Sequence, residues 1–543
     1  MIKAKSITKK LVQNESIILV LIFIIAMGIR LYMASHNRVI GSDGVGYCEQ
    51  AINFCSGKFV DAITRNQTLY PIIIAFFHSF FRDIEFCGKM VSVISGALLV
   101  IVLYLFAKKL YSKKVALMSV LLIAFYPDYV YCSTEVMTES LYIFLRTAAI
   151  LIGLSALKTN KKISFVVTGI VIGLCYLTRA IGLLDFITML IFIFLFTIVR
   201  PGRMLKKTVL PCLMLSIGFL PLFVSYIIYL HEAQGVWKLS GLGGEQRLVW
   251  FDTKEAGDEK FEKDLYSLSP DAREFRESPR KKMGVFILIR NNFKRLPEIY
   301  LRALNQMYMV FIPSILSIFI IILSAIGLIQ CGMHKTDSFW DLYVLGWIII
   351  PLLALGFVAL PLERRFLIPL FPFVLIWASK GIGELSQWAI NALHIEKANI
   401  KKLFIGIISC IVLVSFVPAL KYPMTTGKFW EPYERKLAGL WLKKHTAPDC
   451  KIMSRYRIIG FYAERKWVAI PMSDYDKLLK FAQYNDIKYL VFDEVAVEFR
   501  PQLAFLIDET KAPEELKPVY IFDDVPAHRF VIYKFPIEIT AMK

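Results

Sequence analysis

The stretch KMVSVISGALLVIVLYLFA, residues 89–107, is almost wholly apolar and is followed at once by Lys108 and Lys109. A helix of about 20 apolar residues spans the roughly 30 Å hydrocarbon core of a bilayer. Ten further runs of this kind lie at 17–34, 115–132, 139–157, 163–177, 181–199, 208–230, 309–329, 342–360, 366–379 and 403–420. The sequence therefore predicts a polytopic α-helical membrane protein with about 11 transmembrane helices, two of which, 163–177 and 366–379, are marginal in length.

The composition agrees with this class. Hydrophobic residues make up 56% of the 543 residues, and charged residues only 20%. So much apolar surface cannot be hidden from water, which excludes a disordered, collagenous or ordinary soluble protein. The net charge of +20 comes from short basic clusters between apolar runs, so nucleic acid is not an expected partner. The cysteines form no CxxC pair, which argues against a zinc site or a disulfide scaffold.

The basic clusters also predict the topology. They flank alternate apolar runs and fall on one side, at 3–10, 108–114, 158–162, 200–207, 335 and 380–402. Cytoplasmic loops carry such an excess of Lys and Arg, so we expect a multi-pass protein of the cell (plasma or inner) membrane, with its amino terminus inside and its carboxyl terminus outside. Arg30 and Tyr32 follow the first run where a small-residue cleavage site would lie, which predicts a retained helix and not a signal peptide.

The chain is predicted to have two domains. A membrane module, 1–420, has outer loops at 35–88 and 231–308, and a small extracytoplasmic α/β domain follows at 421–543. The first loop contains two amphipathic stretches, 47–56 and 69–81, suited to lying in the membrane interface. In the tail, the apolar periodicity predicts helices at 433–445 and 475–485, and strands at 451–454, 467–470, 488–492 and 529–534.

Acidic and polar residues at the outer ends of spans are the first functional candidates, because ionisable groups near membrane depth are costly. Asp43, flanked by glycines, is a candidate general base, or it forms a turn or helix cap. Glu135 and Glu139 are predicted one helical turn apart, facing the same cavity as Asp43, or capping a helix. Asn66 and Tyr70 are candidates to bind a hydroxylated substrate, or they cap an interfacial helix.

Basic residues on the predicted outer side oppose the general trend. Arg179, Arg364 and Arg365 have guanidinium groups that suit a donor phosphate. The alternatives are that these side chains reach out to lipid headgroups, or that Glu363 pairs with Arg364.

Five ordered motifs within residues 15–380 resemble a known family. They are YCEQAINFCSGKF at 47–59, TLYPIIIAFFHSFF at 68–81, FYPDYVYCSTEVMTESLYIFL at 125–145, GIVIGLCYLTRAIGLL at 169–184 and ERRFLIPLFPFVLI at 363–376. Together with an acidic residue in the first outer loop, they resemble the GT-C membrane glycosyltransferases of the protein O-mannosyltransferase and aminoarabinose-transferase branch, glycosyltransferase family 39-like.

The resemblance implies an enzyme that transfers a hexosyl or pentosyl group from a polyprenyl-phosphate donor to a lipid, glycan or protein acceptor on the extracytoplasmic face. It gives Asp43 the role of catalytic base and Glu139 that of the second acidic position. This chain has Asp43-Gly44 where the protein mannosyltransferases often show Asp-Glu, and Asn66 to Leu69 depart from the aminoarabinose transferases near Arg65. Neither acceptor is therefore carried over. No cofactor and no metal ligand is assigned, and a divalent metal is left open.

A direct displacement that inverts the anomeric centre fits these residues, with Asp43 taking a proton from the acceptor while the arginines stabilise the leaving lipid phosphate. The sequence contains no P-loop and no dinucleotide fingerprint, so no nucleotide site is expected. Three alternatives remain: a transporter or flippase for lipid-linked sugars, an O-antigen ligase or polymerase, and a structural or sensory protein whose tail binds a ligand.

Overall fold

The structure is a computed structural model of the chain. It describes residues 15–64, 66–199, 206–235, 237–241, 262–263, 265–276, 290, 293–333, 338–358, 364–394, 406, 410, 414, 433–523 and 529–536. The chain divides into two compact units: a helical unit of residues 1–37, 47–244 and 284–427, and an α/β unit of residues 38–46, 245–283 and 428–543. Helix α3, Ser42–Cys55, begins in the α/β unit and continues into the helical unit.

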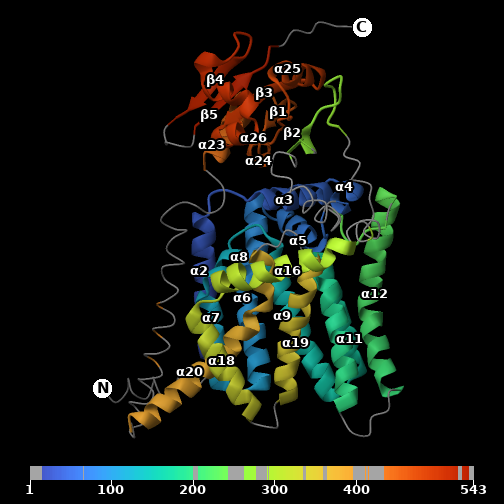
Figure 1. Ribbon diagram of the computed structural model, residues 1–543, viewed down its shortest axis with the longest axis vertical. Coiled ribbons are helices and arrows are strands. Elements are labelled where there is room, and N and C mark those ends of the chain that lie inside the picture. The colour runs from blue at the N-terminus through green and yellow to red at the C-terminus, as the bar shows by residue number, and fades with distance from the viewer. Residues whose placement is uncertain are drawn as a thin grey trace. The chain divides into compact units, whose positions relative to one another are not determined.

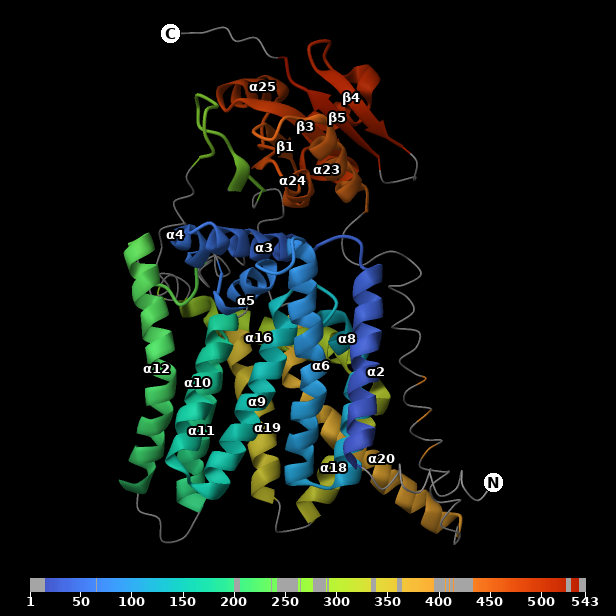
Figure 2. The ribbon, with the colours of Figure 1, turned by 180° about the vertical axis from the view of Figure 1, so that it is seen from behind.

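Long helices that run side by side build the helical unit (Figures 1 and 2). From the amino terminus to the large outer loop, its helices are α2 Glu15–His36, α4 Phe59–Ile63, α5 Leu69–His78, α6 Ile84–Leu110, α7 Lys113–Phe125, α8 Pro127–Cys132, α9 Thr138–Thr159, α10 Lys162–Thr178, α11 Gly182–Val199 and α12 Lys206–Gln234. After that loop follow η2 Phe293–Arg295, α16 Leu296–Gln306, η3 Met307–Phe311, α17 Ile312–Ile315, α18 Ile318–Met333, α19 Ser338–Val358, η4 Arg364–Phe366, η5 Ile368–Leu370 and α20 Pro372–Ala392.

Several described helices are long and apolar enough to cross a membrane. Four meet that description by length and composition: α2, α6, α9 and the part of α12 from Thr208 to Gln234. The pair Tyr300–Ile315 and Ile318–Ile329, bent by 99° at a short break, makes a fifth if it is one span. The α10, α11 and α19 regions contain shorter apolar helices. The chain is thus a multi-pass membrane protein. The count of eleven stays a prediction, and the expected span at 403–420 lies outside the described residues apart from 406, 410 and 414.

The predicted span at 115–132 is broken in the structure. Helix α8 begins at Pro127, directly after α7, and proline has no N–H to donate to the carbonyl of Ile123. The guanidinium of Arg30, fully buried on α2, donates instead to the carbonyls of Ile123 and Ala124, at 3.4 and 3.2 Å. Proline therefore interrupts the span, and a buried arginine supplies donors to the carbonyls at the end of α7.

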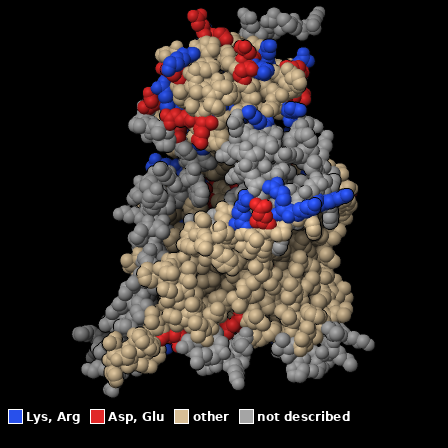
Figure 3. All heavy atoms as spheres, in the orientation of Figure 1, with Lys and Arg blue, Asp and Glu red and all other residues tan. Residues whose placement is uncertain are grey.

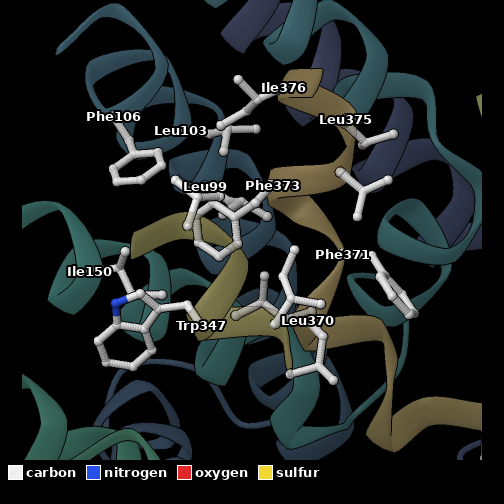
Figure 4. Packing of buried hydrophobic residues seen from close by; sticks show 14 of the residues in the cluster. Leu99, Leu103, Phe106, Ile150, Trp347, Leu370, Phe371, Phe373, Leu375 and Ile376 are labelled. Carbon is white, nitrogen blue, oxygen red and sulfur yellow. The ribbon is translucent and has the colours of Figure 1, made fainter. Parts of the chain in front are cut away.

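Small residues let α10 and α12 approach each other closely. A side chain at Gly169 would collide with the carbonyl of Leu215, and one at Gly218 with the carbonyl of Val166. Such contacts are typical of helix packing in membranes, where dispersion contacts hold the helices together. Elsewhere the unit is filled by one large cluster of buried apolar side chains, and Figure 4 shows the part of it around Phe373, where α6, α9, α19 and α20 contribute.

The α/β unit is built around a five-stranded sheet. Its helices are α23 Tyr433–His445, α24 Arg457–Ala463, α25 Tyr475–Tyr484, α26 Glu494–Phe499, η6 Pro501–Ile507 and η7 Glu509–Lys511. Its strands are β1 Lys451–Ser454, β2 Lys466–Ala469, β3 Ile487–Asp493, β4 Lys517–Phe522 and β5 Phe530–Lys534. The strand order is β2-β1-β3-β5-β4, with β2, β1 and β3 parallel and β3, β5 and β4 antiparallel. In the centre, Leu490 pairs with Met453 on one side and Tyr533 on the other.

The tail's predicted elements agree with this sheet. The helix at 433–445 and the strand at 451–454 are confirmed residue for residue, and the other predicted elements are displaced by only one or two residues. Helices α24 and α26 and strand β4 were not predicted. Strand β4 lies at the sheet edge, is largely exposed and contains Pro518, so its apolar alternation is weak.

Part of the loop after α12 belongs to the α/β unit. The carbonyl of Tyr266 accepts a hydrogen bond from the N–H of Met472 at 2.8 Å, and the rings of Phe275 and Phe481 lie 5.0 Å apart. The two units differ in their surfaces: Figure 3 shows mostly uncharged side chains on the face of the helical unit, and many charged ones on the α/β unit. The first surface suits lipid and the second suits water.

Candidate functional site

Three of the predicted site residues meet at the start of α9. Glu139 lies in the first turn of this helix and is only 1% exposed. Arg179 donates from Nη1 to the carboxylate oxygen Oε1 of Glu139 at 2.5 Å, and to the hydroxyl of Thr138 at 3.0 Å. The Nε atom of Arg365 lies 4.0 Å from the same carboxylate oxygen.

The backbone explains how these arginines reach Glu139. Arg179 follows α10, and its N–H donates to the carbonyl of Cys175 at 2.8 Å. A Cβ at Gly182 would collide with the backbone of α10, so glycine permits the tight turn into α11. Arg365 lies in the 3-10 turn η4. The side chain of Arg364, also predicted to bind phosphate, lies outside the described residues.

The aromatic ring of Phe366 lies against both guanidinium groups. Its centroid is 5.3 Å from Cζ of Arg179 and 5.7 Å from Cζ of Arg365, which allows cation–π attraction. We name Glu139, Arg179, Arg365 and Phe366 the Glu139 cluster. Burial by itself lowers the pKa of Arg179. The charge of Glu139 and, to a smaller extent, the phenol of Tyr47 outweigh this effect, so the pKa of Arg179 is raised.

The two arginines of the Glu139 cluster together form a candidate phosphate-binding site. The side chains of Arg179 and Arg365 are 15% and 28% exposed, so both remain partly accessible. Two guanidinium groups lie near one carboxylate. Partly desolvated guanidinium forks of this kind bind phosphate well.

Glu135 is placed differently from its prediction. Helix α9 begins at Thr138, so Glu135 precedes the helix and is not one helical turn from Glu139. Its carboxylate accepts a hydrogen bond from the amide of Asn37 at 2.6 Å, whereas the carboxylate of Glu139 pairs with Arg179. The reason is the break after α8, which ends the helical periodicity before Glu135. Burial raises the pKa of Glu135 to about 8, although Lys89 and the Asn37 hydrogen bond oppose this shift.

Asp43 is exposed and occupies the second position of α3. The first turn closes through the N–H of Val45, which donates to the carbonyl of Gly41 at 3.1 Å. Asp43 belongs to the α/β unit, whereas the Glu139 cluster belongs to the helical unit. Tyr47 follows four residues later on the same face of α3, and its effect on the pKa of Arg179 indicates that its ring is near this cluster. The predicted cavity shared by Asp43 and Glu139 stays a prediction.

Asn66 and Tyr70 form hydrogen bonds within the protein, and their predicted contact with a substrate stays a prediction. The amide of Asn66 donates to Oε1 of Gln50 at 3.1 Å, and Gln50 returns a bond to the carbonyl of Asn66 at 3.1 Å. Tyr70 is 0% exposed, and its hydroxyl donates to the carbonyl of Gly88 at 3.0 Å and contacts the hydroxyl of Ser92 at 2.8 Å. These hydrogen bonds hold the first outer segment together and leave Tyr70 no open surface.

The helical unit contains a second ionic cluster that was not predicted from the sequence. Nε of Arg146 lies 2.8 Å from Oδ1 of Asp185, and the hydroxyl of Tyr142 donates to Oδ2 of Asp185 at 2.6 Å. Arg146 also donates to the carbonyls of Pro369 and Trp347, at 2.9 and 2.5 Å. We name this set the Arg146–Asp185 cluster. The sequence does contain an indication of this ion pair, because Arg146 and Asp185 each interrupt an apolar run. Ionisable residues are rare in such runs and usually pair with one another.

Metal binding was left open from the sequence. Within the described ranges, the structure contains no group of three or more His, Cys, Asp or Glu side chains that could hold a metal ion.

The helical unit with its apolar helices and the small α/β unit define the chain as a multi-pass membrane protein with a separate α/β unit. Residues 68–229 match the family described as dolichyl-phosphate-mannose-protein mannosyltransferase, and this stretch includes Glu139 and Arg179. No curated protein sequence matches the chain.

Solved structures share the fold. The apo oligosaccharyltransferase of Archaeoglobus fulgidus is 14% identical with a TM-score of 0.58, and the match covers 88% of this chain and 69% of that one. ArnT from Cupriavidus metallidurans is 12% identical in the apo state with a TM-score of 0.57, and the match covers 95% of this chain and 97% of ArnT. ArnT bound to undecaprenyl phosphate matches over the same shares at 12% identity with a TM-score of 0.54. The predicted resemblance to GT-C membrane glycosyltransferases is confirmed by these matches.

Proposed function

We propose that this protein takes a sugar from a polyprenyl-phosphate donor and passes it to an acceptor on the extracytoplasmic face of the cell membrane. One observation carries the proposal: Arg179 and Arg365 converge on Glu139 and Phe366, with both guanidinium groups partly accessible. A lipid-linked phosphate needs such a cationic site near the ends of the membrane spans. The fold shared with ArnT, whose structure holds undecaprenyl phosphate, supports this class of donor.

The proposed reaction is a direct displacement at the anomeric carbon. Asp43 accepts the proton of an acceptor hydroxyl, whose oxygen forms a bond to the anomeric carbon as the bond from that carbon to the phosphate oxygen breaks. The polyprenyl phosphate leaves with the negative charge, which Arg179 and Arg365 stabilise. The configuration of the sugar is inverted. Glu139 holds the two arginines in position, because its buried carboxylate contacts both.

The basic clusters support the extracytoplasmic side, because they are predicted at the opposite ends of the spans from Arg179 and Arg365. Among lipid, glycan and protein acceptors, and between hexosyl and pentosyl donors, the described residues favour none. A panel of polyprenyl-phosphate sugars supplied to the reconstituted full-length protein, with the lipid product followed, identifies the donor.

The experiment that tests the proposal changes Asp43 to Asn. We expect the reconstituted variant to transfer sugar about 100-fold more slowly or worse, because the general base is removed. Asp61→Asn is the matched control, since Asp61 is also an exposed acid in the same outer segment. Transfer at the wild-type rate by Asp43→Asn would leave Asp43 as a helix-capping residue. If the wild-type protein transfers none of the sugars and binds no polyprenyl phosphate, the proposed function itself is wrong.

Glu139→Gln keeps the shape of the side chain and removes its charge. We expect slower transfer and weaker donor binding, because neither arginine is then held by a carboxylate. Wild-type donor dependence in this variant would show that the arginines need no anchor.

A further inference from the structure

Residues 38–42, just before Asp43, are hydrogen-bonded to helices of the α/β unit. Residues 38–46 belong to the same compact unit as α23 and α24. The N–H of Ile40 donates to the hydroxyl of Tyr462, on α24, at 2.8 Å. Nζ of Lys436, on α23, donates to the carbonyl of Arg38 at 2.6 Å. Two hydrogen bonds to the backbone therefore fix this segment within five residues of Asp43.

The segment that contains Val39 and Ile40 is also buried. Val39 is 4% exposed and Ile40 is 0% exposed, so both side chains pack against neighbouring residues. A buried backbone N–H needs an acceptor, and the Tyr462 hydroxyl is the acceptor that Ile40 has. Loss of that oxygen would leave the amide unpaired or move the segment.

The two side chains that hold the segment are themselves well fixed. Nζ of Lys436 lies 4.6 Å from the ring centroid of Tyr462, so the two side chains support each other. Helices α23 and α24 approach so closely that a Cβ at Gly439 would collide with Cβ of Tyr462. The acceptor oxygen thus belongs to a closely packed pair of helices. Between Ile40 and Asp43 lie only Gly41 and Ser42, and the first turn of α3 closes at Gly41.

We propose that Tyr462 and Lys436 are positioning residues, through which the α/β unit sets the position of the Asp43 carboxylate. This inference rests on the proposed function, in which Asp43 is the general base. It gives the carboxyl-terminal unit a role in the rate of transfer. The residues act through the backbone of 38–40 and do not touch the reacting atoms, so they affect the turnover number and not the binding of the donor.

Tyr462→Phe tests the inference, since it removes the hydroxyl and keeps the ring. Tyr533→Phe is the matched control: Tyr533 lies in the same unit, is 0% exposed, and its hydroxyl donates to the carbonyl of Leu506 at 2.9 Å. We expect Tyr462→Phe to lower kcat about tenfold with the donor KM unchanged, because a small displacement of a catalytic group is costly. Tyr533→Phe should keep the wild-type kcat. Lys436→Met should act in the same direction as Tyr462→Phe.

Two further measurements separate this inference from the proposed function. Hydrogen exchange of the full-length protein should show faster exchange at residues 38–46 in Tyr462→Phe and unchanged exchange there in Tyr533→Phe, whether or not a substrate is known. In the Asp43→Asn background, Tyr462→Phe should cause no further loss of the residual rate. Unchanged exchange in Tyr462→Phe, an equal loss of kcat in both tyrosine variants, or a change in KM alone would overturn the inference. A protected 38–46 segment in a protein that transfers no sugar would overturn only the proposed function.

Discussion

Two charged clusters lie on one face of α9, and they differ in the number of arginines and in the exposure of their side chains. Glu139 and Arg146 are seven residues apart, which is about two helical turns, so their side chains leave the helix in nearly the same direction. The Arg146–Asp185 cluster pairs one guanidinium with one carboxylate, with side chains only 1% and 2% exposed. The Glu139 cluster pairs two guanidinium groups with one carboxylate, and both arginines are partly exposed.

This difference is the one expected between a structural cluster and the proposed donor site. In the Arg146–Asp185 cluster, carbonyls of two other segments and the hydroxyl of Tyr142 complete the hydrogen bonds, so the charges serve to join α9, α11, α19 and η5. In the Glu139 cluster, two arginines lie near one carboxylate, and both of their side chains are partly exposed. Partly exposed guanidinium groups can bind an anion, whereas a fully buried ion pair cannot.

The largest effect is expected when the buried ion pair of Arg146 and Asp185 is broken. Arg146→Met leaves Asp185 charged and buried without its partner, which costs about 3–5 kcal/mol of folding free energy. We expect poor yield or a much lower unfolding temperature in detergent. Replacing both partners by apolar residues, in Arg146→Met with Asp185→Leu, should recover part of that loss. A single variant as stable as the wild type would contradict the structural role.

A smaller effect is expected at the open cluster, and it should appear in donor binding. Arg179→Lys or Arg365→Lys keeps the charge but loses the planar fork, so the apparent KM for the polyprenyl-phosphate donor should rise about tenfold. Stability should change little. Titration of the donor against each purified variant gives this value, with Arg302→Lys, an exposed arginine of α16, as the control. If both lysine variants kept the wild-type donor KM, the arginines would serve only to reach lipid headgroups.

The smallest expected effect concerns Glu135, which lies just before α9. Its pKa is raised from an ordinary 4.5 to about 8 by burial, with Asn37, Lys89 and Glu85 around it. Above pH 4.5 the unfolded chain loses this proton while the folded chain keeps it, so stability falls as pH rises through about 8. Between pH 7 and 9 the loss should be about 1 kcal/mol.

Unfolding temperatures measured across this pH range check the prediction. Glu135→Gln imitates the protonated acid, so its unfolding temperature should be nearly flat where that of the wild type falls. A parallel decline in both proteins would assign the pH dependence to another group.

Local patterns in the sequence were sufficient for much of the fold. Apolar runs predicted the membrane class, and periodicity predicted α23 and β1 residue for residue, because burial of one helix face or one strand face repeats along the chain. The candidate arginines and Glu139 also followed from the sequence, since ionisable residues stand out at the ends of apolar runs.

The contacts of those residues required the folded chain. Arg179 lies 40 residues from Glu139 in sequence, Arg146 lies 39 from Asp185, and Ile40 lies 422 from Tyr462. Periodicity extends over a few turns and carries no information about such distant pairs. Glu135 and Glu139 do not share a helix, because α8 ends at Cys132 and α9 begins only at Thr138. The role proposed for Tyr462 depends on the fold, which brings α24 and the Asp43 segment together in one unit.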